Sequence, residues 1–559
     1  MPRDPNDKPD VDVVVIGGGV NGTGVARDAA LRGLRVALFE RNDLAFGASG
    51  NSSGMIHGGP RYLTYDPSVT ESSCLDSGYI QSIAPHLLFR IPFLFPVGAG
   101  PVSHVALSLI DAFFEAYDRY QPLKRGKPHT RLSADDLRAL EPGLRGDVIG
   151  GVSFDEWGID GARLVAANAV DARRHGARVS NHTTVLRVLR REDTGAPYGV
   201  EVRDRLTGRA ETVTARVIVN ATGAWSQITT GLAGLPDKSA PVRGGKGIHI
   251  VYDRRLTNYA IVARTIDGRQ IFLEPWQNMS VLGTTDDDYY GDLDDVCATE
   301  DEVRDLEQAL AKVFPAIKGA RAIGTYAGVR PSLFAWGKIE DKLSREHEVI
   351  DHAAHGAPGL VSMIGGKLAS YRLFAEEATD EVARLVGRGD ACATHRRPLP
   401  GGERVIDPFA LADRIGCDAV AARRLVYRHG SDAELVAERV RRRPAERAVV
   451  CACEPVLEAE VRHVVEHELA RTVADVARRT RLGLGACGGY GCALRCGQLV
   501  AGGQGLSPRA GRLSALQFLE AQAARRAPAL GAVQARQEAL GLASLRAEVG
   551  LGRSEEDEP

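Results

Sequence analysis

Residues 11–22 read VDVVVIGGGVNG, and this stretch decides the fold of the N-terminal part of the chain. The first six residues, Val11–Ile16, form an almost continuously apolar, β-branched run, which is typical of a strand buried on both faces. Three glycines follow in the spacing G-x-G-x-x-G, at Gly17, Gly19 and Gly22. Glycines at this spacing permit a tight turn, a close approach of the backbone to a phosphate, and close packing of a helix on the strand. The stretch therefore predicts a strand that turns directly into a helix.

The next two segments complete this unit. A helical pattern, TGVARDAALRG, ends at Gly33, and a second β-type run over residues 34–39 closes with Glu40. The start of the helix would offer N–H groups and a positive dipole end to a pyrophosphate, and the Glu40 carboxylate can accept ribose hydroxyls. A lone G-x-G-x-x-G can be an ordinary glycine-rich turn, but here strand, glycines, helix, strand and acid follow in register. The sequence therefore predicts a Rossmann-like dinucleotide-binding unit.

Two later segments favour a flavin over a nicotinamide cofactor. Residues 217–225 read VIVNATGAW, a buried strand followed by Ala221, Thr222 and Gly223, and residues 360–372 read LVSMIGGKLASYR, a third strand followed by Gly365 and Gly366. The first segment resembles the strand-turn motif of FAD oxidoreductases of the D-amino-acid oxidase type. In the second, a helix start aimed at the flavin could stabilise charge on the reduced ring. Either segment alone could be an ordinary strand-to-helix turn.

A closer resemblance begins at residues 52–62, SSGMIHGGPRY, which is similar to the S-S-x-x-I-H-G-G-x-R-Y segment of FAD-dependent glycerol-3-phosphate dehydrogenases. Further matching blocks occur in the same order and extend the resemblance over roughly residues 10–545: DEWGIDGARL (155–164), GKGIH (245–249), LGTTD (282–286), YAGVRP (326–331), and GGK (365–367) with Tyr371 and Arg372. The family implies a Rossmann-like FAD-binding domain and an antiparallel-sheet substrate domain, followed by a small helical domain. It implies oxidation of glycerol 3-phosphate to dihydroxyacetone phosphate by hydride transfer to FAD held non-covalently.

The resemblance also implies a set of site residues. The catalytic candidates are His57, His249, Arg330 and Lys367. A phosphate needs cations, so the substrate-binding candidates are Arg61, Tyr62, His249, Arg330, Lys367 and Arg372. The expected cofactor contacts are Gly17, Gly19, Gly22, Glu40, Arg41, Ser49, Ser53, Ala221, Thr222, Gly223, Trp225, Gly365, Gly366, Lys367 and Leu368. A base with a pKa near neutrality suits the removal of the alcohol proton, and we prefer His57 over His249 because its block follows directly on the FAD-binding half.

The cysteines are unevenly spread, and five of the nine crowd into residues 451–496. Cys451 and Cys453 form C-x-C, and after 33 residues Cys487 and Cys492 form C-x₄-C. This arrangement resembles the bacterioferritin-associated-ferredoxin type of [2Fe–2S] module found at the C-terminus of the large subunit of anaerobic glycerol-3-phosphate dehydrogenase. Four thiolates suit an iron–sulfur centre and equally suit zinc. We favour the cluster, because it provides a one-electron step after a two-electron flavin, and we interpret Cys496 as a bystander.

The composition limits the partners. Formal net charge is -2 and the sequence pI is about 6.7, so we expect no nucleic-acid surface. No signal peptide or apolar run of membrane-spanning length is visible, and the chain is interpreted as cytoplasmic, at most peripheral on the inner face of the cell membrane. Residues 86–120 are apolar and aromatic, and we expect them to form a buried segment of the substrate domain. The alternative is that this segment rests on a membrane surface. The resemblance implies a quinone or electron-transfer subunits as partners, and it leaves open a membrane-anchoring subunit, a homo-oligomer or a hetero-oligomer.

The domain organisation follows from these motifs. Residues 1–10 are expected to be a disordered leader and 396–408, rich in Pro and Gly, a linker. The oxidoreductase body would span 11–395, with FAD-binding pieces at 11–60, 155–235 and 355–390 and substrate-domain pieces between them. Residues 409–510 would form the helical cysteine domain, and 511–559 a helical segment with an acidic tail. Two other functions stay open: an FAD and iron–sulfur dehydrogenase of an amino acid or hydroxy acid, and a purely electron-transferring flavoprotein without a substrate.

Overall fold

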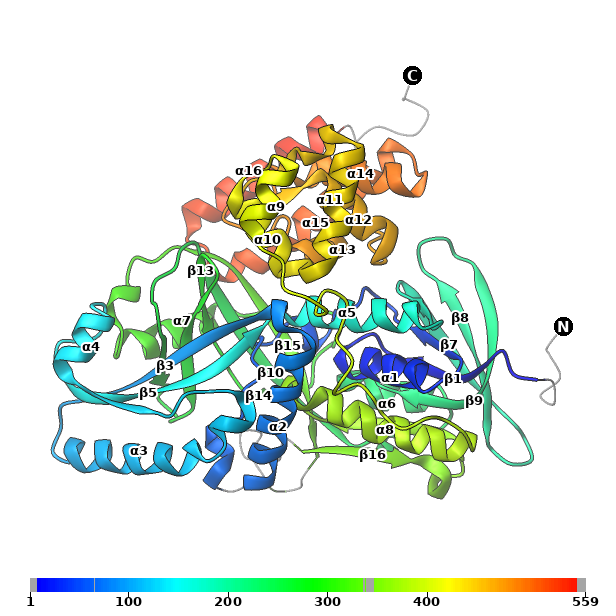
Figure 1. Ribbon diagram of the computed structural model, residues 1–559, viewed down its shortest axis with the longest axis horizontal. Coiled ribbons are helices and arrows are strands. Elements are labelled where there is room, and N and C mark those ends of the chain that lie inside the picture. Colours follow the sequence, from blue (N-terminus) through cyan, green and yellow to red (C-terminus); the bar gives the residue numbers. More distant parts are fainter. Residues whose placement is uncertain (1–7, 65, 335–336, 338–345, 550–559) are drawn as a thin grey trace.

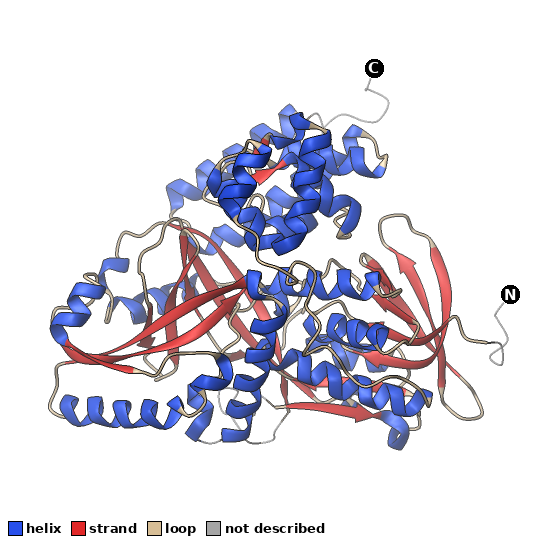
Figure 2. Cartoon of the chain, in the orientation of Figure 1, coloured by secondary structure: helices blue, strands red, loops and turns tan. Residues whose placement is uncertain are grey.

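The computed structural model describes residues 8–64, 66–334, 337 and 346–549, and these form three parts. Two β-sheets with their helices lie side by side, and a helical domain rests over both (Figure 1). Figure 2 shows that strands are confined almost entirely to the two lower parts. The leader at 1–7 and the acidic tail at 550–559 lie outside the described residues.

The first sheet contains the predicted dinucleotide-binding unit. Its main path runs β16-β17-β9-β1-β2-β6, in which all neighbours are parallel except β16 and β17. Helices α1 (Val20–Leu31), α5 (Gly161–Arg174) and α8 (Tyr371–Val386) pack on one face, and the β7–β8 hairpin curls over the other. The strands are β1 (Val11–Ile16), β2 (Val36–Phe39), β6 (Arg178–Ser180), β7 (Thr183–Arg190), β8 (Pro197–Asp204), β9 (Ala210–Asn220), β16 (His347–Asp351) and β17 (Leu360–Gly365).

The second sheet lies beside the first and is antiparallel except where β11 runs parallel to β3. Its path is β14-β10-β13-β12-β11-β3-β5-β4, and β15 pairs with β10. Around it lie α3 (Ser103–Asp118), α4 (Ala134–Leu140) and α7 (Glu300–Ala311). Helix α2 (Pro67–Ile83) contacts α8, and α6 (Ser226–Gly231) contacts β9 and β17 of the first sheet. The strands are β3 (Leu88–Gly98), β4 (Thr130–Ser133), β5 (Val148–Ile159), β10 (Val242–Tyr252), β11 (Ala260–Arg264), β12 (Gln270–Trp276), β13 (Met279–Gly283), β14 (Asp287–Asp288) and β15 (Ala322–Leu333).

The sheets divide the chain slightly differently from the predicted pieces. Strand β5 pairs with β3 through Ile159, so the second FAD-binding piece begins after that residue and not at 155. Strand β16 pairs with β17, so the third piece begins at His347. Both boundaries differ from the prediction for the same reason. A strand belongs to the sheet with which it shares backbone hydrogen bonds, and the sequence motifs do not reveal which strand that is.

The C-terminal part is a helical domain with a small β18–β19 hairpin. Between the two pairs of motif cysteines, the chain turns near Leu469, whose φ is 62°, and this turn separates α12 from α13. Residues 511–548 are not a separate segment, because Leu519 of α15 packs in one core with Val461 and Val473. The elements are α9 (Pro408–Ile415), α10 (Ala419–His429), α11 (Ala433–Arg442), β18 (Val449–Cys451), β19 (Val456–Leu457), α12 (Glu458–His467), α13 (Val473–Thr480), α14 (Ala493–Gln504), α15 (Pro508–Arg526) and α16 (Ala532–Glu548).

The apolar segment 86–120 becomes β3 and α3. Strand β3 lies inside the second sheet, between β11 and β5. Helix α3 buries Leu107, Phe114 and Tyr117 but exposes Val105 and Leu109. Within the described residues, no helix combines the length and the apolar character that crossing a membrane requires.

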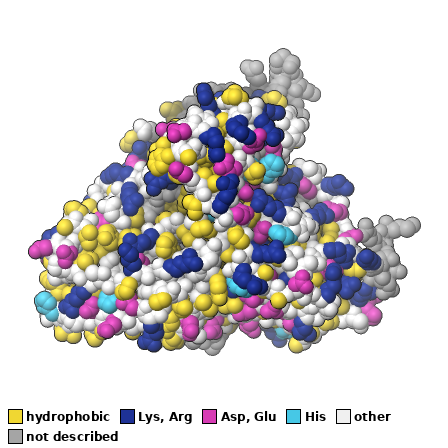
Figure 3. Space-filling view, in the orientation of Figure 1, with side chains coloured by type: hydrophobic (Ala, Val, Ile, Leu, Met, Phe, Trp, Pro, Cys, Tyr) yellow, Lys and Arg dark blue, Asp and Glu magenta, His cyan; other side chains and the backbone are white. Residues whose placement is uncertain are grey.

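Acidic and basic side chains are interspersed on the face shown in Figure 3, so that face has no extended patch of positive or of negative charge.

Helices α14 and α15 cross where Gly497 meets Gly511, and this contact generates a stability prediction. A Cβ at residue 497 would lie 2.2 Å from the Gly511 carbonyl oxygen, whereas a Cβ at Gly502 of the same helix would meet nothing within 4 Å. We expect Gly497→Ala to destabilise the protein by about 1–3 kcal/mol through overpacking. Gly502→Ala should instead stabilise it by about 0.5–1 kcal/mol, because alanine loses less backbone entropy in a helix. Denaturant unfolding of both variants checks this, and equal effects would contradict the crossing geometry.

Candidate active site and candidate metal centre

A cavity of about 950 Å³ lies where the carboxyl ends of β1, β9 and β17 approach β10 and β15. Ligands in open parallel sheets bind at this edge, and the volume suits a dinucleotide with a small substrate. Fourteen of the fifteen expected cofactor residues line it: Gly17, Gly19, Glu40, Arg41, Ser49, Ser53, Ala221, Thr222, Gly223, Trp225, Gly365, Gly366, Lys367 and Leu368.

The glycine-rich turn is as crowded as its spacing predicts. Gly17 has a φ of 109°, and a Cβ there would lie 2.6 Å from the Ala221 carbonyl oxygen. Gly22, the fifteenth expected residue, does not line the cavity; its Cβ would lie 2.0 Å from the Gly17 carbonyl oxygen, so it lets α1 pack on the turn. Helix α1 then begins at Val20, with its first N–H groups beside the cavity. The glycines let the backbone approach a pyrophosphate here, and the Val20 amide donates to Ser49 Oγ at 2.9 Å, so a serine hydroxyl shares this place with the backbone donors.

Glu40 closes the second strand and lies at the cavity wall. Its carboxylate accepts hydrogen bonds from the amides of Gly18, at 2.6 Å, and Asn42, at 2.7 Å. Burial raises the pKa of Glu40, and these two hydrogen bonds lower it only in part. The carboxylate is thereby fixed at the edge where a ribose would bind, and the cavity residues fit an FAD.

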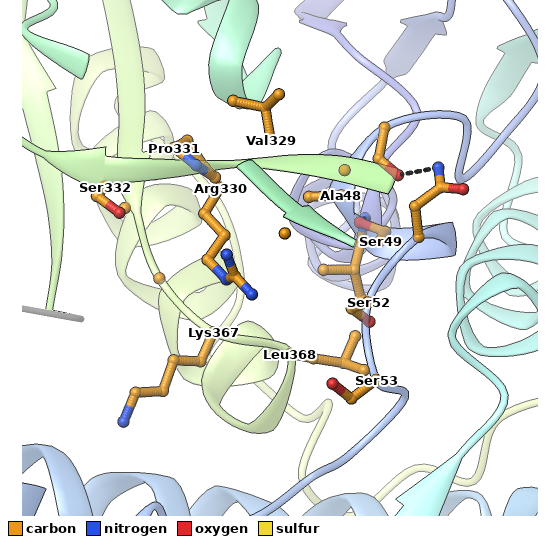
Figure 4. Close-up of a pocket in the computed structure, with 18 of the residues that line it drawn as sticks. Ala48, Ser49, Ser52, Ser53, Val329, Arg330, Pro331, Ser332, Lys367 and Leu368 are labelled. Atoms are coloured by element: carbon orange, nitrogen blue, oxygen red, sulfur yellow. Dashed lines mark hydrogen bonds between the residues drawn. The ribbon is translucent and has the colours of Figure 1, made fainter. Parts of the chain in front are cut away.

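Arg330 projects from β15 into the cavity (Figure 4). One guanidinium nitrogen donates to Asp286 Oδ1 at 2.9 Å and to the Thr285 carbonyl at 3.2 Å; the other donates to Thr284 Oγ1 at 3.1 Å. A Cβ on Gly247 would lie 2.5 Å from the guanidinium. Any residue larger than glycine at position 247 would therefore clash with the Arg330 side chain in this position. The planar donor is therefore oriented before any anion arrives.

Lys367 also lines the cavity, but its side chain extends away from Arg330 (Figure 4). Its ammonium lies 3.7 Å from the centre of the Tyr62 ring and donates to Ser73 Oγ at 3.3 Å. Tyr62 and His57 line the same cavity. The side chain of Arg61 lies outside the described part of the structure, so its expected role is not tested.

His249 lies one layer behind the cavity wall. Its Nε2 shares a 2.8 Å hydrogen bond with Ser53 Oγ, and its ring stacks on Tyr326 with 4.6 Å between centroids. Burial, and then the nearby charge of Arg330, lower the pKa of His249 to about 3. The imidazole is therefore neutral at physiological pH and reaches the cavity through Ser53.

The structure contradicts the expectation that Arg372 binds substrate. Arg372 is buried in α8, where its guanidinium donates to Asp76 at 2.5 Å and to Glu376 at 2.5 Å, and it does not line the cavity. The G-G-K…Y-R block brings Arg372 close in sequence, but the helix that begins at Tyr371 turns its side chain toward α2. Its charge is used to join two helices.

Two features of the cavity are not predicted from the sequence. Asp286 and Thr284 orient Arg330, a role that the L-G-T-T-D block does not reveal by itself. An apolar arm also extends the cavity, and it is lined by Phe93, Phe95, Leu109, Ile110, Phe113, Phe114, Phe154, Val262 and Phe272. The alternation of Phe93 and Phe95 on one face of β3 is the available signal.

The four cysteines of the C-x-C and C-x₄-C motifs come together in the helical domain as two pairs. Cys451 and Cys492 are buried and interact so that each affects the pKa of the other, and so do Cys453 and Cys487, which are exposed. In the described part of the chain, groups of three ligating side chains with all ligand atoms within 4.8 Å are His429, His463 and Glu468, and Asp43, His182 and Asp475; neither includes a cysteine. Cys496 is buried in the helical core.

The environment of the inner pair favours a thiolate. The hydrogen bond with Cys492 lowers the pKa of Cys451 to about 6 against the effect of burial, and the amides of Gly483 and Glu454 lower it further. The pKa of Cys492 is raised by the same hydrogen bond and by burial. Thiolates are the ligands that iron–sulfur and zinc sites require.

Comparison with protein families agrees with this geometry. Residues 12–372 match the model of FAD dependent oxidoreductases, and residues 392–507 match the C-terminal domain of alpha-glycerophosphate oxidase. Among solved structures, glycerol-3-phosphate dehydrogenase from Bacillus halodurans complexed with FAD shares the fold, with a TM-score of 0.70, 24% identity, and coverage of 93% of this chain and 96% of that one.

Curated relatives are similar over most of the chain. One component of the anaerobic glycerol-3-phosphate dehydrogenase of Escherichia coli K12 is 33% identical over 492 residues, which cover 88% of each protein. A component of the anaerobic enzyme of Haloferax volcanii is 32% identical, covering 86% of this chain and 81% of that protein. Glycerol-3-phosphate dehydrogenase 1 of Mycobacterium bovis is 34% identical, covering 85% and 92%. The chain therefore belongs to the FAD-dependent oxidoreductases and, within them, to the glycerol-3-phosphate dehydrogenase family.

Proposed function

We propose that this protein oxidises sn-glycerol 3-phosphate to dihydroxyacetone phosphate at a bound FAD. The observation that carries the proposal is Arg330, which faces a dinucleotide-sized cavity with its guanidinium already oriented by Asp286 and Thr284. The relatives named glycerol-3-phosphate dehydrogenases at 33–34% identity support the choice of a phosphorylated substrate.

The substrate phosphate would bind at Arg330, in a cavity that also holds the charge of Lys367. Arg330 presents a planar donor suited to phosphate oxygens, and Lys367 adds a second positive charge steadied by the Tyr62 ring. A guanidinium fixed before binding loses little rotamer entropy when the anion arrives. Asp286 offsets part of the positive charge while the cavity holds no substrate, and this allows the arginine to lie at a partly buried position.

The alcohol proton would pass to His57. FAD, when bound, supplies the acceptor for the hydride from the carbinol carbon. His57 lines the cavity, whereas His249 lies behind Ser53, so His57 is the histidine placed to reach a substrate hydroxyl. His249, neutral because its pKa is lowered to about 3, can accept a hydrogen bond from the Ser53 hydroxyl and so orient the cavity wall.

The cysteine site would receive the electrons one at a time as a [2Fe–2S] centre. The four thiols occur as a buried pair, Cys451 with Cys492, and an exposed pair, Cys453 with Cys487, and this supports two metal ions, each held by one pair. Zinc stays the second candidate.

The electrons would continue to a quinone, either directly or through electron-transfer subunits. Relatives named as single components of an anaerobic enzyme support a multi-subunit assembly, in which one partner would anchor the complex to the membrane. The exposed apolar residues Val105 and Leu109 of α3 support a peripheral position on the inner face of the cell membrane.

The first test is an anaerobic visible spectrum of the purified protein before and after addition of glycerol 3-phosphate. We expect the flavin bands to bleach, because the substrate reduces the flavin. Proline, sarcosine and 2-hydroxy acids serve as controls for the competing dehydrogenase function. Bleaching by one of these compounds instead would overturn the substrate, and bleaching by none would favour a flavoprotein that only transfers electrons.

The second test concerns the phosphate site. Arg330→Gln should raise the KM for glycerol 3-phosphate by at least about tenfold, because a charge-assisted hydrogen bond contributes about 1.5–3 kcal/mol. Arg269→Gln is the matched control: Arg269 lines the same cavity but is held by two carboxylates, Asp267 at 2.6 Å and Asp287 at 2.8 Å, whereas Arg330 has only Asp286 among the ion pairs of the described residues. Steady-state kinetics that show equal effects of both variants would contradict the assignment of Arg330.

The third test is metal analysis of protein purified without oxygen. We expect about two iron atoms and two sulfides per chain, as in a [2Fe–2S] centre, and their loss in Cys453→Ser. Cys417→Ser, a half-buried cysteine remote in sequence from the motif, is the control and should keep its iron. Zinc without iron, or iron retained in Cys453→Ser, would refute the cluster assignment.

A further inference from the structure

The helical domain contacts the FAD-binding domain through a buried, bidentate ion pair. Arg479 of α13 donates to Asp43 with Nη1–Oδ2 at 2.9 Å and Nη2–Oδ1 at 2.7 Å, and both side chains are at most 1% exposed. Arg478 approaches the same carboxylate at 3.3 Å. Asn181 donates to Asp43 at 2.9 Å and to the Leu469 carbonyl of the helical domain at 2.9 Å. The Asp43 carboxylate is thus bound by two arginines of the helical domain and by an asparagine that itself contacts that domain.

Asp43 belongs to the loop that follows Glu40 and forms one wall of the cavity. Its neighbours Asn42 and Phe46 line the cavity, but Asp43 does not. The loop folds back on the glycine-rich turn through a hydrogen bond from the Ala45 amide to the Gly18 carbonyl at 3.0 Å. Arg478 also lies over the Phe46 ring, 5.7 Å from its centroid. The arginines of α13 therefore act on the cofactor wall through the loop and not by contact with the cofactor.

The segment that follows α13 reaches the cysteine site. Arg481 lies 3.6 Å from Glu454, the residue after Cys453. The Gly483 amide faces the Cys451 sulfur, and a Cβ on Gly485 would lie 2.4 Å from the Cys453 Cβ. One short stretch of chain, residues 478–485, therefore contacts both the flavin-side loop and the cysteines.

We propose that Arg479, with Arg478, positions the Asp43 loop for FAD binding, so that FAD retention and metal occupancy of the cysteine site reinforce each other through residues 478–485. The coupling rests on the proposed function, because it requires FAD in the cavity and metal at the cysteines. A shift of this segment on metal loss would loosen the Asp43 loop, and an empty flavin cavity would in turn release the segment, since such coupling is reciprocal.

The ion pair is charged at neutral pH. Burial by itself raises the pKa of Asp43, but the charges of Arg479 and Arg478 outweigh it and hold that pKa at about 2. Removal of one partner would leave an uncompensated buried charge and could unfold the junction. The test therefore includes the double variant Asp43→Asn/Arg479→Gln, which removes both charges together and keeps the side-chain sizes similar.

The experiment measures the rate of FAD release from the holoprotein by the growth of free-flavin fluorescence. We expect Arg479→Gln and the double variant to release FAD about tenfold faster than the native chain, as for the loss of a coupling of about 1.4 kcal/mol. Arg471→Gln is the matched control. Arg471 lies just before α13 and crosses the same junction to Asp204 at 2.8 Å, but it does not touch the Asp43 loop. Its FAD release should match the native rate.

Metal removal by a chelator gives the second arm. We expect it to speed FAD release about tenfold in the native chain and less than about twofold in Arg479→Gln, because the link is already broken there. Unchanged release in a double variant with a native melting temperature would overturn the positioning role. An equal effect of chelation with and without Arg479 would overturn the coupling. If the purified protein contains no metal, both the coupling and the cluster assignment are overturned, but the release rates with and without Arg479 still decide the positioning role. If glycerol 3-phosphate is not the substrate, neither release rate changes.

Discussion

The contact between the Gly17 turn and the Ala221 carbonyl is the constraint on which the rest of this structure depends. At 2.6 Å from the position a Cβ would occupy, the carbonyl leaves room for a hydrogen atom only. This contact joins the ends of β1 and β9 and holds the start of α1 at the cavity. A larger residue would push the strand ends apart and remove the backbone donors from the place of the pyrophosphate.

The pairing register of two strands in the second sheet places the arginine that completes the site. Strands β10 and β15 pair so that Gly247 lies opposite Gly328, two residues along from the pair of Gly245 and Arg330. The absence of a side chain at Gly247 lets the guanidinium lie across the strand, where Asp286 and Thr284 fix its orientation. Such preorganisation is what an enzyme needs to bind a small dianion without ordering flexible side chains at each turnover.

The helical domain is joined to the body by buried charges and not by apolar surface alone. Arg163 of α5 pairs with Glu468, and Arg479 of α13 pairs with Asp43. Buried ion pairs add little net stability, but they tolerate only one arrangement, because any other leaves charges unpaired. The cysteine pairs are therefore held at a defined place relative to the flavin cavity, as a one-electron relay would require.

The sequence by itself determined the strand–glycine–helix unit, the order of the motifs and the four cysteines, because these features depend on local spacing and on residue types that few other structures need. Only the tertiary structure decided that Arg372 serves an ion pair with Asp76, that His249 lies behind Ser53, and that the last helices share the core of the cysteine domain. It also decided the place of Asp43, whose partner lies 436 residues further along the chain. The physical reason is that a side chain's role depends on which distant element faces it, and sheet register and helix packing set that partner without leaving a local signal.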